Sequence, residues 1–472
     1  MRKMWYCILV LICVLKGGGT VRRKRRIMSG LLALCIALSV LPLSACTAPK
    51  LTLDPEELYA LPELPERYTA LNQQLSAIQE GGAEYATPVS GSNIQPVQMM
   101  DLDGDGREEA LAFFRQSDGE KPLKIYIFAA DGDSYRQVAV IEGSGLAIYS
   151  VAYSDMNGDG KMEIIVGWRV SMELQALTVY TLEKDGIREL ARSDYVKYAV
   201  ADLDGDGQRE LTVLRADETG AGTADCYLWK NGTLTLGSSI RVSMTMAELS
   251  QQGRITVGVL RSSTPALFVT GVADSTRAIT DVLVLHGGEL TNLVLSAMTG
   301  VSGESSRFCT LYPTDINGDG VTEVPRTVPL SGDEESTASQ RIDWISYDAS
   351  GLAAKALSTY HAVEDGWYLR LPEGWAENIQ AARTSGGEET AVTFYVEQDT
   401  TAAGLLRITA LSGADRERQA VRTGRFILSR NGGVIYVGEL LKGNEDWKYS
   451  VTEDQVRSAF GLITREWSAG DN

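Results

Sequence analysis

The stretch DLDGDGREE at residues 101–109 decides the fold of this chain, because the same nine-residue pattern recurs three more times. The other copies are DMNGDGKME at 155–163, DLDGDGQRE at 202–210 and DINGDGVTE at 315–323. We call the four copies loops 1 to 4, in chain order. Each has Asp or Asn at positions one, three and five, Gly at position six and Glu at position nine. Recurrence of this kind is typical of a protein built from one repeated structural unit.

The spacing of oxygen-bearing side chains predicts a metal site in each loop. Alternate side chains of a tightly curled loop point inward, and calcium takes about six to eight oxygen ligands. A backbone carbonyl at position seven would complete the set, so we expect about four calcium ions. The simpler interpretation, an Asp-Gly hairpin turn, does not explain the Glu that recurs at position nine.

The first half of the pattern also opens an EF-hand loop, which needs a Glu at position twelve and a helix on each side. Position twelve is Ala112, Val166, Val213 or Arg326 in the four copies. Short apolar runs of strand length flank the loops instead, such as PVQMM before loop 1 and ALAFF after it. Each loop is therefore expected to join two strands, although Pro325 interrupts the strand after loop 4.

The spacing of the loops predicts a fifth, degenerate unit. Loop 4 starts 113 residues after loop 3, about twice the other spacings, so a further copy is expected near residue 258. The stretches GRITVGVL (253–260), ALFVTGVAD (266–274), AITDVLVLHG (278–287) and ELTNLVLSA (289–297) repeat the strand order there. The acidic loop is replaced by RSSTP. Residues 94–361 are therefore predicted to form a mainly β fold, a β-propeller of about five four-stranded blades.

The loops resemble the FG-GAP and VCBS repeats of integrin-α-like β-propellers, here in a bacterial surface lipoprotein. The resemblance implies calcium in the loop between the first two strands of a blade. The side-chain ligands carried over by position are Asp101, Asp103, Asp105 and Glu109; Asp155, Asn157, Asp159 and Glu163; Asp202, Asp204, Asp206 and Glu210; and Asp315, Asn317, Asp319 and Glu323. Backbone oxygens would come from Arg107, Lys161, Gln208 and Val321. The family often has seven blades, and the FG and GAP tripeptides are absent here.

The N-terminal residues read as an export signal. A basic cluster at 22–26 precedes an apolar run, 27–43, which ends in the sequence LSAC. LSAC resembles the bacterial lipobox, so residues 1–45 are expected to be a lipoprotein signal peptide whose true start lies near 21–28. Cys46 would then carry the lipid that anchors the protein to the bacterial cell membrane, facing outside the cytoplasm. The alternative is an uncleaved signal anchor.

Charge and composition narrow the class of partner. The formal net charge is −18 even though residues 1–45 are basic, and a surface this acidic repels nucleic acid. The two histidines, His286 and His361, leave little room for histidine-based catalysis, and both are expected to be structural. The common nucleophile, zinc and phosphate-binding motifs are missing.

Two further segments flank the repeats. Residues 46–93 are expected to be a tether followed by an amphipathic helix that packs on the propeller, with Tyr68, Leu71, Leu75 and Ile78 on one face. Residues 362–472 are predicted to be a small α+β domain. Its signals are strand-like runs at 367–375, 390–397, 404–411 and 426–440, a hairpin turn at 431–433, a capping box of Thr452 and Gln455, and a terminal helix with Val456, Phe460, Ile463 and Trp467 on its apolar face.

These features favour a calcium-binding, membrane-anchored propeller that binds a protein or a glycan and is not an enzyme. Two alternatives stay open: a carbohydrate-active hydrolase or lyase with a carboxylate pair in the propeller funnel, and a scaffold subunit of an envelope complex that docks through 362–472. The aromatic residues Trp168, Trp229, Trp344 and Tyr347 are expected to pack between blades rather than to stack on sugars. Cys226 and Cys309 are expected to be buried thiols rather than a disulfide.

Overall fold

The computed structural model describes residues 69–463, except 118, 133, 251, 274–276, 308–310, 331–339 and 399–400. These residues belong to one compact unit, Glu66–Asn472. The predictions for the leader, Cys46, Tyr68, Cys309 and Trp467 lie outside the described residues. Within them, no helix has the length and apolar character that crossing a bilayer requires.

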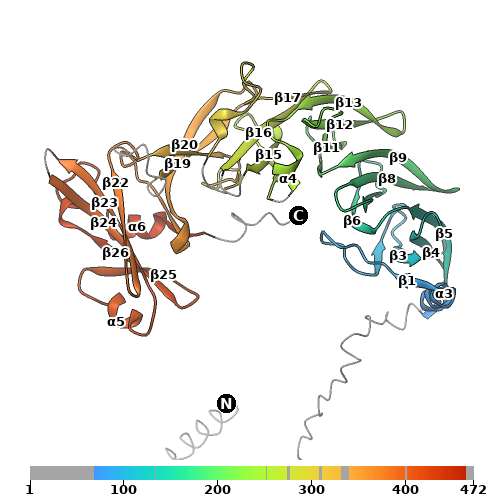
Figure 1. The fold of residues 1–472 in the computed structure, drawn as a ribbon, viewed down its shortest axis with the longest axis horizontal. Coiled ribbons are helices and arrows are strands. Elements are labelled where there is room, and N and C mark those ends of the chain that lie inside the picture. Colours follow the sequence, from blue (N-terminus) through green and yellow to red (C-terminus); the bar gives the residue numbers. More distant parts are fainter. Residues whose placement is uncertain are drawn as a thin grey trace, which may run out of the picture. The chain divides into compact units, whose positions relative to one another are not determined.

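The described chain consists mainly of antiparallel sheets that succeed one another along the sequence, and we number them 1 to 6 (Figure 1). Sheets 2 and 3 contain four strands each, in sequence order, and in sheet 1 both β1 and β2 pair with β3. Sheet 1 comprises β1 (Ala83–Tyr85), β2 (Val97–Met100), β3 (Glu109–Gln116), β4 (Leu123–Asp131) and β5 (Ser134–Gly143). Sheet 2 comprises β6 (Ala147–Ser154), β7 (Glu163–Arg169), β8 (Gln175–Glu183) and β9 (Gly186–Tyr195), and sheet 3 comprises β10 (Lys197–Ala201), β11 (Glu210–Ala216), β12 (Gly222–Lys230) and β13 (Thr233–Arg241).

The degenerate unit predicted near residue 258 is confirmed as sheet 4. Its strands are β14 (Arg254–Val259), β15 (Pro265–Ala273), β16 (Arg277–His286) and β17 (Glu289–Asn292), which pair in sequence order. The last strand is shorter than predicted, since it ends at Asn292. A short helix, α4 (Met246–Ser250), connects sheet 3 to sheet 4, and the 3-10 turn Gly303–Ser305 follows sheet 4.

Sheet 5 crosses the domain boundary that was predicted at residues 361/362. It comprises β18 (Val324–Pro329), β19 (Gln340–Tyr347), β20 (Ala353–Ala362), β21 (Trp367–Arg370) and β27 (Phe460–Leu462). The 3-10 turn Val363–Asp365 ends at Gly366, whose φ of +72° reverses the chain so that β21 pairs with β20. Pro325 does not prevent β18 from forming, because β18 is the edge strand of the sheet and proline is tolerated there.

Sheet 6 lies in the predicted α+β region and has a different topology. Its strands β22 (Gln380–Gly386), β23 (Glu389–Gln398), β24 (Thr401–Leu411), β25 (Arg425–Asn431) and β26 (Val434–Leu440) pair in the order β22-β23-β24-β26-β25. Helix α5 (Arg416–Ala420) connects β24 to β25, and the 3-10 turn Lys442–Asn444 follows β26. The predicted hairpin turn is present, with Gly432 and Gly433 at φ of +55° and +89° between the paired residues Asn431 and Val434.

Neighbouring sheets bury apolar side chains between them, in chain order. One hydrophobic cluster joins sheets 1 and 2, and others join sheets 2 and 3, 3 and 4, 4 and 5, and 5 and 6. Strand β7 shows why the strands read as continuous apolar runs: Ile164 and Val166 belong to the cluster with sheet 1, and Ile165 to the cluster with sheet 3. Side chains of a strand alternate between the two faces of its sheet, so a sheet packed on both faces needs apolar residues at successive positions. This arrangement is propeller-like, and no strand pairing joins sheet 1 to sheet 5 or 6 among the described residues.

Both predicted helices are present, one of them shorter than expected. Helix α3 (Thr69–Glu80) buries Leu71 and Leu75 and contacts β1 and β5. Helix α6 (Glu453–Ala459) starts with the predicted capping box but ends at Ala459. The prediction that it continues through Phe460 and Ile463 was wrong, because Phe460–Leu462 is extended and pairs with β21. There the Phe460 ring stacks on Trp367 at 5.8 Å between centroids.

Candidate metal centres

The four loops occupy equivalent places in their sheets. Loops 1, 2 and 3 connect β2 to β3, β6 to β7 and β10 to β11, so each joins the first two strands of the repeated unit. Loop 4 leads into β18, and a bridge between Thr314 and Glu323 closes its base. In loops 1 to 3 the glutamate at position nine is the first residue of β3, β7 or β11, and in loop 4 it immediately precedes β18, the first strand of sheet 5.

The aspartate at position one organises each loop around itself. In loop 1 the Asp101 carboxylate accepts bonds from the backbone N–H groups of Gly104 and Gly106, both at 2.9 Å. Loops 2, 3 and 4 repeat both bonds, with Asp155, Asp202 and Asp315 as acceptors at 2.7–3.1 Å. The two glycines of loop 1 have φ of +74° and +85°, a conformation that side-chain-bearing residues rarely adopt. The sequence pattern therefore encodes the curl of the loop directly.

Positions three and five continue the same curl. Asp103 and Asp105 each accept a bond from the N–H group two residues later, at 3.2 and 2.8 Å. In loops 2 and 4 the side chain at position three is Asn, and its amide oxygen accepts the equivalent bond at 2.8 and 2.9 Å. The residues at position seven, Arg107, Lys161, Gln208 and Val321, donate their N–H groups to the side chain at position five. Their role as carbonyl ligands stays a prediction.

The glutamate at position nine is buried in all four loops. Glu109, Glu163, Glu210 and Glu323 are between 0% and 3% exposed. One carboxylate oxygen of each accepts the backbone N–H of position two, at 2.9, 2.9, 2.7 and 3.2 Å respectively. The other oxygen of Glu323 has no hydrogen-bond partner among the described residues. A fully buried carboxylate oxygen without a partner is costly unless a cation or proton compensates it.

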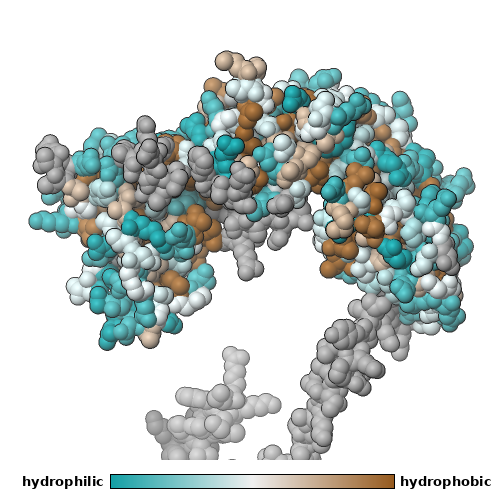
Figure 2. Space-filling model, in the orientation of Figure 1, coloured by the Kyte–Doolittle hydropathy of each residue, from teal (hydrophilic) through white to brown (hydrophobic). Residues whose placement is uncertain are grey.

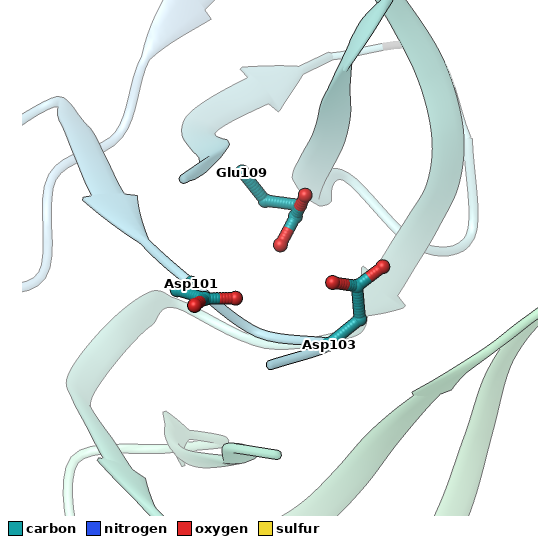
Figure 3. Close-up of side chains that lie close together, drawn as sticks. All are labelled: Asp101, Asp103 and Glu109. Atoms are coloured by element: carbon teal, nitrogen blue, oxygen red, sulfur yellow. The ribbon is translucent and has the colours of Figure 1, made fainter. Parts of the chain in front are cut away.

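Three carboxylates converge in loop 1 and in loop 3, whereas the described residues of loops 2 and 4 hold no such group. Oxygens of Asp101, Asp103 and Glu109 lie within 4.8 Å of one another, and Figure 3 shows the three side chains facing a common space. The carboxylates of Asp202, Asp204 and Asp206 gather in the same way in loop 3. Clustered like charges repel, whereas a hard cation such as calcium accepts this set of carboxylate and carbonyl oxygens. The donor sets and the orphaned Glu323 oxygen therefore fit a divalent cation.

Burial raises the pKa of all four glutamates. For each of them burial is the largest cause, and the nearby aspartates raise the pKa further. The pKa of Glu210 and that of Glu323 are raised from 4.5 to about 7. A bound cation would oppose this effect, because it favours the ionised carboxylate.

The raised pKa values predict that calcium stabilises the chain more at pH 8 than at pH 6. Below about pH 7 the cation must displace protons from Glu210 and Glu323, and above it the carboxylates are already ionised. The metal-free chain should show the opposite trend. Its folded state binds more protons than its unfolded state between about pH 4.5 and 7, so its stability falls as the pH rises through that interval. Thermal melts in chelator and in calcium at both pH values test this, and an equal calcium effect at pH 6 and 8 would contradict it.

Most of the other residues singled out in the sequence are packed inside the fold. Trp168, Trp344 and Tyr347 are buried, which supports packing over sugar stacking, whereas Trp229 is only half-buried. His361 stacks on Tyr368 at 5.5 Å, and burial lowers the pKa of its imidazole to about 3, so its neutral form fills the space. Cys226 is a buried thiol, and burial raises its pKa.

Three buried aspartates that the sequence motifs did not single out lie in the third strand of sheets 3 and 4 and in the second strand of sheet 5. Asp225, Asp281 and Asp343 are 0–3% exposed. Asp225 accepts bonds from Arg215 and Ser239, Asp343 from Arg341 and Ser358, and Asp281 from the backbone and hydroxyl of Ser243. These bonds satisfy the carboxylates, so the three are structural. The signal in the sequence that could have identified them is an aspartate inside an apolar run, as in AITDVLVL.

Comparison with known proteins identifies the repeat. Residues 101–166 match the family model for the FG-GAP-like repeat. No curated protein matches the sequence. Among solved structures, the exotype rhamnogalacturonan lyase YesX is similar at 12% identity and a TM-score of 0.27, over 68% of this chain and 74% of the lyase. A candidate 6-phosphogluconolactonase from Bacteroides fragilis is similar at 9% identity and a TM-score of 0.26, over 67% of this chain and 85% of that protein.

Proposed function

We propose that this chain, which carries an FG-GAP-like repeat at residues 101–166, is an exported, calcium-stabilised, propeller-like module that binds a protein or a glycan. The observation that carries the proposal is the fourfold repetition of one loop geometry directly before a strand of the sheet. A catalytic metal would call for one distinctive site, whereas four equivalent sites suit a structural role. Cys46 would hold the module at the membrane through its lipid, as the LSAC sequence indicates.

Calcium would stabilise the loops mechanically. Each ion would neutralise three or four clustered acidic side chains and draw the position-nine glutamate toward the loop. The glutamate is the first residue of β3, β7 and β11 in sheets 1 to 3, so the ion would connect the loop to the core of the sheet. The surface outside the four loops would then be available to bind the protein or glycan ligand.

An apolar surface on sheet 2 is the best candidate for contact with a protein ligand. Leu146, Val170, Met172 and Leu174 are 37–87% exposed, and Leu146 bonds to Arg169 at the base of the hairpin between β7 and β8. This hairpin is at the end of β7 opposite to loop 2. Figure 2 shows apolar side chains at the surface near β6. Exposed apolar groups that cluster in this way are typical of protein interfaces.

Binding to extracellular protein and glycan arrays, with calcium or with chelator, tests the proposal. We expect retention only in calcium, and we expect Met172→Glu to weaken retention on a protein target about ten-fold or more. Leu352→Glu is the matched control, because Leu352 is also exposed, at 64%, but lies in the turn between β19 and β20. Retention that is the same in chelator, or lost equally in both variants, would contradict the proposal.

The enzyme alternative, which places a carboxylate pair in the propeller funnel, stays a prediction. An open cleft of about 340 Å³ lies on sheet 6, lined by residues that include Arg407, Arg425 and Glu389. Glu389 is the single carboxylate in this lining and lies 3.5 Å from Arg425. Glycosidases use a pair of carboxylates. Turnover of a polysaccharide bound on the array would nevertheless favour the enzyme over the binding module.

A further inference from the structure

Loops 1, 2 and 3 are connected to one another by backbone hydrogen bonds. The N–H of Met162 in loop 2 donates to the carbonyl of Leu102 in loop 1 at 3.0 Å. The N–H of Arg209 in loop 3 donates to the carbonyl of Met156 in loop 2 at 2.8 Å. Both bonds join position eight of one loop to position two of the loop before it.

The same position-two residues also hold the glutamates. The N–H groups of Leu102, Met156 and Leu203 donate to the glutamate at position nine of their own loops. In each loop, position eight is followed directly by the glutamate at position nine. The hydrogen bonds within and between the loops therefore link Glu109, Glu163 and Glu210 in one series, in which carboxylates alternate with peptide groups. The side chains at position two are 0–1% exposed, so the series is anchored in the core. A shift of one glutamate would therefore act on the peptide groups that bond to the next loop.

The loops are also in direct contact. A Cβ atom on Gly104 of loop 1 would lie 2.7 Å from the carbonyl oxygen of Gly160 in loop 2. A Cβ atom on Gly158 of loop 2 would lie 3.5 Å from the carbonyl oxygen of Gly207 in loop 3. Positions four and six of neighbouring loops thus touch at the same place in each pair. A loop that is ordered by a cation would leave its neighbour less room to move.

Loop 4 has a different neighbour. The N–H of Thr322, at position eight, donates to the carbonyl of Val259 at 2.9 Å. Val259 ends the first strand of sheet 4, whose connection is RSSTP and holds no acidic residue. The bond that joins one metal loop to the next in sheets 1 to 3 therefore joins loop 4 to a loop without metal ligands.

We propose that loops 1, 2 and 3 bind calcium as one cooperative unit and that loop 4 binds it independently. The proposal rests on the calcium binding proposed above and adds the coupling between sites. The physical cause is ordering: the first ion fixes the peptide groups at positions two and eight, so a neighbouring ion has less conformational entropy to remove. Coupling of this kind is reciprocal, so loss of one site in the row formed by loops 1, 2 and 3 must weaken the other two sites.

Calorimetric titration of the full chain with calcium tests the coupling. Asp155→Ala removes the organising side chain of loop 2, the middle of the row, and should weaken the remaining sites of loops 1 and 3 about five-fold or more. Asp315→Ala makes the matched change in loop 4 and should remove one ion while the other three keep their affinity. If Asp155→Ala also removes one ion without weakening the rest, the coupling does not exist.

Two controls keep the outcomes distinct. If the unmodified chain binds no calcium, the proposed function fails, whereas normal binding with independent sites overturns only the coupling. Should Asp155→Ala fail to give a cooperative melt in chelator, Asp202→Ala removes the end of the row instead. It should weaken loops 1 and 2, and unchanged affinity there would overturn the proposal.

Discussion

In millimolar calcium the chain is expected to melt roughly 7–13 °C higher than in chelator. A site with a dissociation constant of about 0.1–1 mM contributes about 1.4–2.7 kcal/mol at roughly 10 mM calcium. Four such sites together contribute roughly 6–11 kcal/mol. An unfolding entropy of about 2.1 cal/mol/K per residue, over about 400 residues, converts this free energy to the stated shift. The measurement is a thermal melt in calcium and in chelator, with bound metal counted on the same sample.

A single-residue variant distinguishes stabilisation by calcium bound in a loop from a general effect of salt on the melting temperature. Asp204→Ala removes the position-three carboxylate of loop 3, so it should lower the melting temperature in calcium and leave it nearly unchanged in chelator. A loss of the same size in chelator would show that Asp204 acts without metal. Magnesium at the same concentration is the ionic control, because magnesium demands a tighter octahedral geometry and dehydrates reluctantly.

Trp367→Ala is expected to destabilise the chain by about 3–5 kcal/mol, the usual loss when a fully buried aromatic is truncated. Trp367 is 1% exposed, and its ring contacts Tyr360 and Phe460 at 5.9 and 5.8 Å between centroids. It also belongs to the hydrophobic cluster that joins sheets 5 and 6. The truncation would therefore leave a cavity between β20, β27 and sheet 6. Denaturant unfolding at fixed calcium measures the loss.

Trp229→Ala provides the matched comparison. It makes the same chemical change in β12, where the indole is half-buried and less apolar area leaves water on folding. Its loss should be clearly smaller. Equal losses would mean that β21 does not hold the last two sheets together in the way that the packing indicates.

The sequence was sufficient to locate the repeats and their strands. The loops could be read because each side chain acts on backbone groups within seven residues, so position and chemistry suffice: Asp101 bonds to Gly104 and Gly106, and Glu109 to Leu102. The degenerate sheet 4 could be found because its strands keep their order after the loop has lost its acids. The capping box of Thr452 and the hairpin at Gly432 are local for the same reason.

Contacts between distant segments could not be read in this way. The pairing of β27 with β21 joins residues about ninety positions apart, and it overrides the helical spacing of Phe460 and Ile463. The buried carboxylates of Asp225 and Asp343 likewise depend on partners in neighbouring strands.

The sequence by itself therefore determined the repeated unit, the candidate ligands and the acidic surface, because these follow from spacing and composition. The tertiary structure alone decided where sheet 5 ends, which glutamate oxygens are buried and which loops touch. The physical reason is that these properties arise when sheets pack face to face. Packing places Leu102 against loop 2 and Met156 against loop 3, and no local pattern within either loop records its neighbour.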